Sequence, residues 1–322
     1  MVPEPTLVAR FERNLDALSA PGQRLGIAVS GGPDSLALLI LAAAARPGAI
    51  EAASVDHALR PESPSEAKMV AGVCRQLGVP HAILTVSWVE KPVAAIQERA
   101  RSARYGLLAD WVSDRALDAL VTAHQANDQA ETLVMRLNRG SGVRGLAAMR
   151  PSAYVPRSAI PLLRPLLGWR RAELGAICAA AGLTPTADPG NEDARYERIR
   201  IRNALGEAEW LDAEAVGRSA AYLASADDTI GWAAAQEWDR TVTAEDRRIA
   251  YRPSGAPAEI VRRIVARAVT ALAHEGLGEA LRGRELASII EALEAGRTAT
   301  LRGVLCAGGK EWRFSKAPAR KA

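Results

Sequence analysis

The fold prediction for this chain rests on the hexapeptide Ser30-Gly31-Gly32-Pro33-Asp34-Ser35. It follows a short apolar run at residues 25–29 and precedes an apolar stretch at residues 36–45, which predicts a strand, a tight turn and a helix. Two adjacent glycines let the backbone approach an anion closely, and the N–H groups at a helix N-terminus supply positive potential. An ordinary capped Gly-Pro turn uses the same residue types, but the strand–turn–helix context favours a phosphate-binding loop.

Strands and helices are expected to alternate on both sides of this loop. Apolar runs at residues 50–55, 81–86 and 119–123 predict three more buried strands. The helices expected between and after them cover residues 65–77, 93–113 and 128–137. This alternation predicts an α/β fold with a doubly wound, Rossmann-like parallel sheet. Ligands of such sheets bind beyond the carboxyl ends of the strands.

The last third of the chain has a different pattern. After a helix expected at residues 170–181, which precedes this part, we expect helices at residues 212–238, 257–273 and 284–295, and strands near 248–251, 298–306 and 311–314. The motifs described here all lie before residue 210. We therefore predict two domains, a catalytic one over residues 1–210 and a smaller, mostly helical one over residues 211–322.

Composition excludes several classes of protein. The longest apolar run, residues 36–45, is shorter than the ~18 residues that span a bilayer. The first 20 residues mix charged and apolar side chains, and the three cysteines are scattered with no CxxC pair. We expect a cytoplasmic protein with no membrane partner, no disulfide framework and no cysteine metal site.

The net charge of +4 is unevenly distributed. Residues 133–202 hold twelve arginines, no lysine and five acidic residues, so this stretch carries +7 and the rest of the chain −3. Guanidinium groups match phosphate oxygens in a bidentate way, so the excess fits a phosphate-rich partner. Charge alone, however, favours an ordinary solvated surface of an arginine-rich chain.

Two common nucleotide-binding motifs are absent. The sequence contains no GxxxxGK[ST], and no GxGxxG follows the first strand, which disfavours a P-loop GTPase and a Rossmann dehydrogenase. The loop at residues 30–35 instead resembles the pyrophosphate-binding loop of N-type ATP pyrophosphatases, the PP-loop enzymes. Enzymes that share it cleave ATP between the α- and β-phosphates and adenylate an oxygen of the substrate. A nitrogen or sulfur nucleophile then displaces AMP.

Further motifs narrow the resemblance. In chain order they are Asp56-His57, Arg101-Ser102-Ala103-Arg104-Tyr105, His124-Gln125-Ala126-Asn127-Asp128-Gln129-Ala130-Glu131, Arg164-Pro165-Leu166-Leu167, Asp188-Pro189-Gly190-Asn191 and Tyr196-Glu197-Arg198-Ile199-Arg200-Ile201-Arg202. In this order and spacing the set is similar to the bacterial tRNA(Ile)-lysidine synthetases, over residues 25–205. Three positions depart from the family pattern, and one of them is Gly190, where a serine is frequent. Gln125 stands where a second histidine is common, and Asn127 where a second acid is common.

The resemblance implies a ligase reaction. ATP adenylates the C2 carbonyl oxygen of the wobble cytidine, position 34, in an isoleucine tRNA with a CAU anticodon, and pyrophosphate leaves. The ε-amine of free L-lysine then attacks C2 and expels AMP, which leaves lysidine and changes codon and aminoacylation specificity from Met to Ile. The expected cofactors are ATP and Mg²⁺. The smaller domain is expected to contact the tRNA, and a homodimer is a further option because dimers are common among soluble enzymes.

The resemblance also assigns residues. The catalytic residues implied are Asp34, Asp128, Glu131, Arg104 and Arg202. Cofactor binding is implied for Ser30, Gly31, Gly32, Pro33, Asp34, Ser35, Asp56 and His57, and metal binding for Asp34 and Asp128. Substrate binding is implied for Asp128, Glu131, Asn191, Arg198 and Arg202.

Physical chemistry supports these assignments, although a purely structural role also explains some of these residues. Asp128 and Glu131 lie at i and i+3 on one helical face, where carboxylates attract an ammonium group or simply favour the helix dipole. The lysine ammonium, with a pKa of ~10.4, must lose a proton, which a carboxylate or His124 could accept. Arg104 and Arg202 are suited to developing negative charge, although the alternation of Arg198, Arg200 and Arg202 also fits one side of a surface strand.

Three other functions compete with this hypothesis. A tRNA thiolase with the same loop needs paired cysteines or an iron–sulfur cluster, and Cys74, Cys178 and Cys306 offer no pairing. A glutamine-fed synthetase needs a glutaminase nucleophile, and Val2 follows Met1 where an N-terminal cysteine would stand. A non-catalytic RNA-binding protein with this fold would not need the acidic residues.

Overall fold

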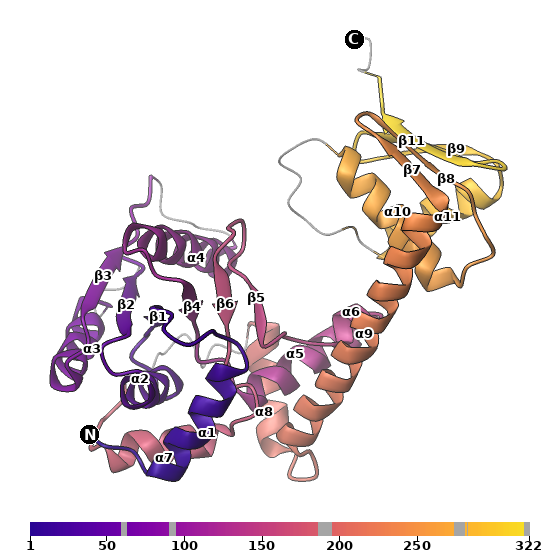
Figure 1. Cartoon of the computed structure of the whole chain (residues 1–322). Coiled ribbons are helices and arrows are strands. Elements are labelled where there is room, and N and C mark those ends of the chain that lie inside the picture. Colours follow the sequence, from indigo (N-terminus) through magenta and orange to yellow (C-terminus); the bar gives the residue numbers. More distant parts are fainter. Residues whose placement is uncertain (59–62, 90–94, 186–194, 274–280, 282, 319–322) are drawn as a thin grey trace. The chain divides into compact units, whose positions relative to one another are not determined.

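The computed structural model describes residues 1–58, 63–89, 95–185, 195–273, 281 and 283–318 of the chain. The chain divides into two compact units, Met1–Tyr222 and Leu223–Ala322 (Figure 1).

A six-stranded sheet forms the centre of the first unit, in the order β3-β2-β1-β4-β6-β5. Its strands are β1 (Leu25–Ala28), β2 (Ile50–Asp56), β3 (His81–Thr85), β4 (Ala119–Val121), β5 (Ser152–Tyr154) and β6 (Pro161–Leu163). The four pairs from β3 to β6 are parallel, and β5 is antiparallel to β6. The parallel α/β sheet predicted from the sequence is therefore confirmed, with β6 and the edge strand β5 as additional strands beyond β4.

Nine helices of the described residues begin in this unit. They are α1 (Pro5–Asp16), α2 (Pro33–Ala45), α3 (Ser63–Leu77), α4 (Ile96–Asp114), α5 (Ala126–Asn138), α6 (Val143–Leu146), α7 (Arg171–Ala180), α8 (Glu197–Glu207) and α9 (Ala213–Thr241). Figure 1 shows α2 and α4 on opposite sides of the sheet.

Alternation along the strands produces two separate cores. Ile27 and Val121 point to the face covered by α1, α2, α3 and α7. Ala53 and Leu120 point to the other face, where α4 supplies Trp111. Because both faces are covered, the inner strands β1 and β4 are apolar throughout, as expected of a doubly wound sheet.

The second unit contains a five-stranded antiparallel sheet, in the order β7-β8-β11-β10-β9. Its strands are β7 (Val242–Glu245), β8 (Arg248–Tyr251), β9 (Thr298–Leu301), β10 (Val304–Ala307) and β11 (Trp312–Lys316). The helices α10 (Ala258–Leu272) and α11 (Gly283–Glu294) pack against it through an apolar core. The single strand expected at residues 298–306 is wrong, because Arg302 and Gly303, both with positive φ, turn the chain into a hairpin.

Gly26 on β1 offers a test of the packing of the α4 face. A Cβ at this position would lie 2.6 Å from Cζ3 of Trp111, a rigid ring in the core. We expect Gly26→Ala to lower the free energy of unfolding by about 1–3 kcal/mol through overpacking. The measurement is urea denaturation. Gly72→Ala on α3, where a Cβ meets nothing within 4 Å, is the control and is expected to stabilise by about 0.5–1 kcal/mol. Equal stability of Gly26→Ala and the wild type would contradict the packing.

Candidate active site

The loop between β1 and α2 is closed by the Ser35 hydroxyl. Its Oγ accepts a hydrogen bond from the Ser30 N–H at 3.1 Å and donates one to the Gly32 carbonyl at 2.9 Å. The Ser30 Oγ lies 3.2 Å from the Ser35 Oγ. Gly31 has a φ of +87°, a conformation that favours glycine, and Pro33 opens α2. The predicted strand–turn–helix is confirmed as local structure.

Asp34, in the first turn of α2, is the most perturbed carboxylate near this loop. Burial raises its pKa from the ordinary 3.8 to about 6, Asp128 adds to the rise, and Arg171 opposes it. Its Oδ1 is buried and has no hydrogen-bond partner among the described residues. A buried, unpartnered carboxylate oxygen beside a phosphate loop fits a Mg²⁺ ligand, since this ion typically takes one or two carboxylates plus substrate phosphates.

The N-terminus of α5 holds the second group of site residues. Gln125 is fully buried and caps the helix: its Oε1 accepts from the Asn127 N–H at 2.6 Å, and its own N–H donates to Asp128 Oδ2 at 3.1 Å. The Ala126 N–H donates to the Trp169 carbonyl at 2.9 Å, which ties this helix to the chain before α7. Gln125, which departs from the family pattern, therefore has a structural role here that the sequence did not indicate.

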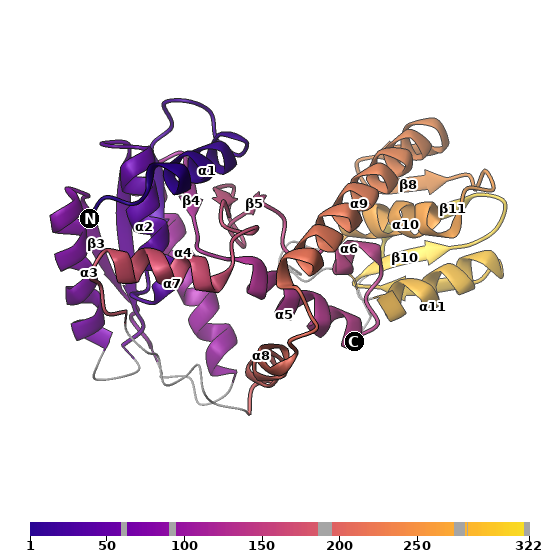
Figure 2. The same ribbon diagram turned by 90° about the horizontal axis from the view of Figure 1, so that it is seen from below.

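Arginines from α8 neutralise the two acids of α5. Arg198 donates from Nε to Glu131 Oε2 and from Nη2 to Asp128 Oδ1, both at 2.7 Å. Arg202 donates from Nε to Glu131 Oε1 at 2.7 Å, and this contact raises the pKa of Arg202. Figure 2 shows α8 beside α5. Asp128 and Glu131 thus share one face of α5, as predicted. The sequence did not reveal that Arg198 and Arg202 pair with these two carboxylates.

The strand considered for residues 198–202 is wrong. These residues lie in α8, which places Arg198 and Arg202 one turn apart on the face towards Glu131. Arg200 is exposed, and its Nη1 donates to the Arg195 carbonyl at 3.0 Å. The helical conformation therefore places Arg198 and Arg202 at the site and Arg200 away from it.

Arg171, at the start of α7, is a site residue that the sequence analysis missed. Its Nη2 lies 3.8 Å from Glu131 Oε1, and its charge is the strongest influence that lowers the pKa of Asp34. Its backbone N–H donates to Asn127 Oδ1 at 3.3 Å. Arg171 thus lies near both the phosphate loop and the α5 acids. Nothing in the Arg170-Arg171 pair itself distinguishes this arginine from its neighbour.

His124, between β4 and α5, is surrounded by positive charge. Burial lowers its pKa well below 6.5, and Arg164, Arg101, Arg104 and Arg198 lower it further. Its Nδ1 lies 3.0 Å from the Thr122 hydroxyl. A neutral imidazole with so low a pKa is poorly suited to keep a proton from an ammonium group.

Three further predicted residues lie at the end of β2 or outside the described residues. Asp56 ends β2, and its Oδ1 accepts from the Ala58 N–H at 2.8 Å. The His57 carbonyl accepts from Trp88 Nε1 at 2.7 Å. Both residues follow the strand next to β1, at the same carboxyl edge as the loop. Asn191 falls outside the described residues.

The three cysteines are free and buried. Burial raises the pKa of the thiols of Cys74, to about 12, and Cys178, to about 11. Cys178 Sγ donates to the Pro33 carbonyl at 3.1 Å and so helps to hold α7 against the start of α2. Within the described ranges no three His, Cys, Asp or Glu side chains group as a metal site would require.

Comparison with known proteins identifies the family. The PP-loop domain family matches residues 6–209. The chain is 45% identical to the tRNA(Ile)-lysidine synthase of Novosphingobium aromaticivorans over 316 residues, which cover 98% of this chain and 95% of that protein. The chain belongs to the tRNA(Ile)-lysidine synthase family. It is also 41% identical to the tRNA(Ile)-lysidine synthase of Zymomonas mobilis, over 94% of this chain and 92% of that protein.

A solved structure supports the fold. The U34-tRNA thiolase NcsA from Methanococcus maripaludis, with its [4Fe-4S] cluster, matches with a TM-score of 0.56 and 16% identity, over 68% of this chain and 78% of that one. At this identity the match concerns the fold alone. Among the helices that the structure describes, none has the length and apolar character to span a bilayer.

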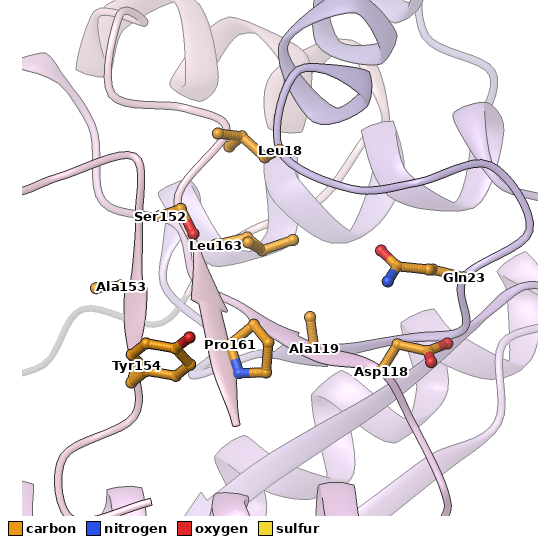
Figure 3. A pocket seen from close by; sticks show the side chains of 9 residues that line it. All are labelled: Leu18, Gln23, Asp118, Ala119, Ser152, Ala153, Tyr154, Pro161 and Leu163. Atoms are coloured by element: carbon orange, nitrogen blue, oxygen red, sulfur yellow. The ribbon is translucent and has the colours of Figure 1, made fainter. Parts of the chain in front are cut away.

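A hollow of about 300 Å³ lies at the opposite edge of the sheet, at the amino ends of β4 and β6. Figure 3 shows Gln23 and Asp118 at one end of it and Tyr154 at the other. Asp118 Oδ2 already accepts from the Arg24 N–H at 2.7 Å. This hollow therefore lies away from the carboxyl edge, where the acidic and basic residues gather.

The raised pKa of Asp34 predicts a stabilising substitution. The native state holds the proton more tightly than the unfolded chain, so stability is lost as pH rises from 3.8 to about 6. Asp34→Asn removes this cost, and we expect it to raise the free energy of unfolding at pH 8 by up to about 3 kcal/mol, with the gain vanishing towards pH 4. Urea denaturation of both proteins at the two pH values measures it. A destabilised Asp34→Asn at pH 8 would contradict a carboxylate whose pKa is raised by burial.

Proposed function

We propose that this chain ligates free lysine to C2 of the wobble cytidine of tRNA(Ile) with a CAU anticodon, at the expense of ATP. The observation that carries the proposal is a phosphate loop with a buried acid, next to a network of two carboxylates and three arginines. Near-full-length relatives at 41–45% identity, both named tRNA(Ile)-lysidine synthase, support the same reaction.

In the first step, the residues of the loop bind the triphosphate of ATP. Backbone N–H groups at the start of α2, together with Ser30 and Ser35, face the phosphates. The cytidine C2 oxygen attacks the α-phosphorus, and the bond from that phosphorus to the β-phosphate oxygen breaks, which releases pyrophosphate. Mg²⁺, held by Asp34 with Asp128 as a second candidate, would neutralise charge on the phosphate oxygens. Arg171 and Arg202, both near Asp34, are placed to stabilise the same charge.

In the second step, lysine displaces AMP. The ε-ammonium gives a proton to a neighbouring carboxylate, and the free amine attacks C2. The bond from C2 to the adenylate oxygen breaks, and AMP leaves with its electron pair. Asp128 is the better candidate to hold the ammonium, because 13% of its side chain is exposed against 2% for Glu131. Glu131 acts as a positioning residue that orients Arg198 and Arg202. Arg104 supplies further positive charge near the adenylated base, and Asn191 is proposed to bind substrate.

The domain assignment follows the same proposal. Residues 1–210 form the catalytic part, and the PP-loop match over residues 6–209 supports this. Residues 211–322 are proposed to contact the tRNA outside the anticodon.

Incorporation of labelled lysine tests the function. Purified protein with ATP, Mg²⁺, lysine and a tRNA(Ile) transcript with a CAU anticodon is expected to release one pyrophosphate and one AMP per lysine incorporated. Asp34→Asn is the control, and we expect it to abolish AMP formation while it retains tRNA binding. If a sulfur donor or another amine were incorporated instead of lysine, the proposal would be wrong.

A further inference from the structure

Three arginines gather around one buried tyrosine at the carboxyl edge of the sheet. Arg101 and Arg104, both on α4, lie with their Cζ atoms 5.0 and 5.2 Å from the centroid of the Tyr105 ring. Arg164, just after β6, joins them: Tyr105 and Arg101 both influence its pKa. We call Arg101, Arg104 and Arg164 with Tyr105 the basic cluster.

The basic cluster has unsatisfied donors. Arg164 is 8% exposed and Tyr105 is 2% exposed. Arg164 Nε is buried and has no hydrogen-bond partner in the parts of the chain that the structure describes. The Tyr105 hydroxyl is also buried, and its neighbours Arg104 and Arg164 can only donate to it, so its own proton has no acceptor among the described residues. Arg164 Nη1 donates to the Arg150 carbonyl at 2.8 Å, which fixes the guanidinium in place. Buried donors without acceptors cost free energy, and a ligand with acceptor oxygens would remove that cost.

The charge of the cluster is also uncompensated. Over the described ranges, no carboxylate pairs with its three arginines, whereas Glu131 neutralises Arg198 and Arg202. Burial lowers the pKa of Arg104 and of Arg164, as expected for cations without a counter-charge. Like charges that are partly or wholly buried, as those of Arg104 and Arg164 are, become favourable when an anion joins them.

The arginines near the phosphate loop differ from those of the basic cluster. The arginines that lower the pKa of Asp34 are Arg171 and Arg202. The arginines that lower the pKa of His124 are those of the cluster, together with Arg198. The arginines of the basic cluster thus lie near His124, and Arg198 lies between them and the acids of α5.

We propose that the basic cluster binds a phosphate group of the polynucleotide next to the base that is modified. The proposal rests on the function proposed above, which requires an RNA substrate beside the ATP site. Guanidinium forks bind phosphate oxygens in a bidentate way, and the Tyr105 hydroxyl adds a neutral donor. Contacts to backbone phosphates fix the register of a nucleic acid, so the cluster would position the target base.

Salt-dependent tRNA binding tests the proposal. Arg101 is the residue to change because its side chain is exposed and forms no ion pair with the residues that the structure describes. We expect Arg101→Gln to weaken tRNA binding about tenfold and to reduce the slope of log K against log salt by about 0.7–1. Arg101→Lys keeps the charge and is expected to restore the slope. Arg99→Gln, at an exposed position on the same helix, is the matched control and is expected to leave both quantities unchanged.

Binding of a non-hydrolysable ATP analogue distinguishes the two sources of phosphate. We expect the analogue to bind Arg101→Gln as it binds the wild type. Weakened analogue binding with an unchanged tRNA salt slope would assign the cluster to the triphosphate and overturn the proposal, as would no change in either. The binding slope does not depend on lysine, so a wild-type protein that binds tRNA but incorporates no lysine would refute the proposed function and leave the phosphate site standing.

Discussion

The buried carboxylate of Glu131 holds the candidate active site together. Only 2% of its side chain is exposed, and three arginines from two helices lie within 4 Å of its oxygens. Ile199 is the one described residue of α8 that is fully buried, so apolar packing holds this helix weakly. Loss of one partner from a buried ion pair typically costs about 3–5 kcal/mol. The position of α8, and with it Arg198 and Arg202, therefore depends on Glu131.

The ion pairs of Glu131 also determine which carboxylate of the site remains without a partner. Arg198 bridges Asp128 and Glu131, which leaves Asp34 as the nearby carboxylate with an unpartnered oxygen. Asp34 is thus suited to bind a cation, and the arginines of the basic cluster, which lie near His124, are suited to bind an anion. An enzyme that brings Mg²⁺, a triphosphate and a polynucleotide together needs both kinds of unsatisfied charge in one site.

Sequence patterns predicted the parts of this site that depend on local structure. The loop at residues 30–35 and the acids at i and i+3 on α5 follow from backbone geometry, and both were expected. The partners of Glu131 lie 67 and 71 residues away, and the spacing of Arg198 and Arg202 fits a strand as well as a helix. Arg164 was noted only as part of a family motif and Arg171 was not singled out, because their burial and neighbours depend on tertiary packing. The short strands of the second sheet, four or five residues each, carry little periodic signal, so their pairing was not predictable.

Hydrogen exchange of α8 in Glu131→Gln tests the role of Glu131 most directly. The account predicts that amides of Glu197–Glu207 lose protection in this variant, while those of Leu25–Ala28 keep theirs. Glu51→Gln is the control, since Glu51 is another buried carboxylate held by two arginines, Arg24 and Arg115, and we expect it to leave α8 protected. Unchanged protection of α8 in Glu131→Gln would show that packing, and not the buried ion pairs, holds this helix in place.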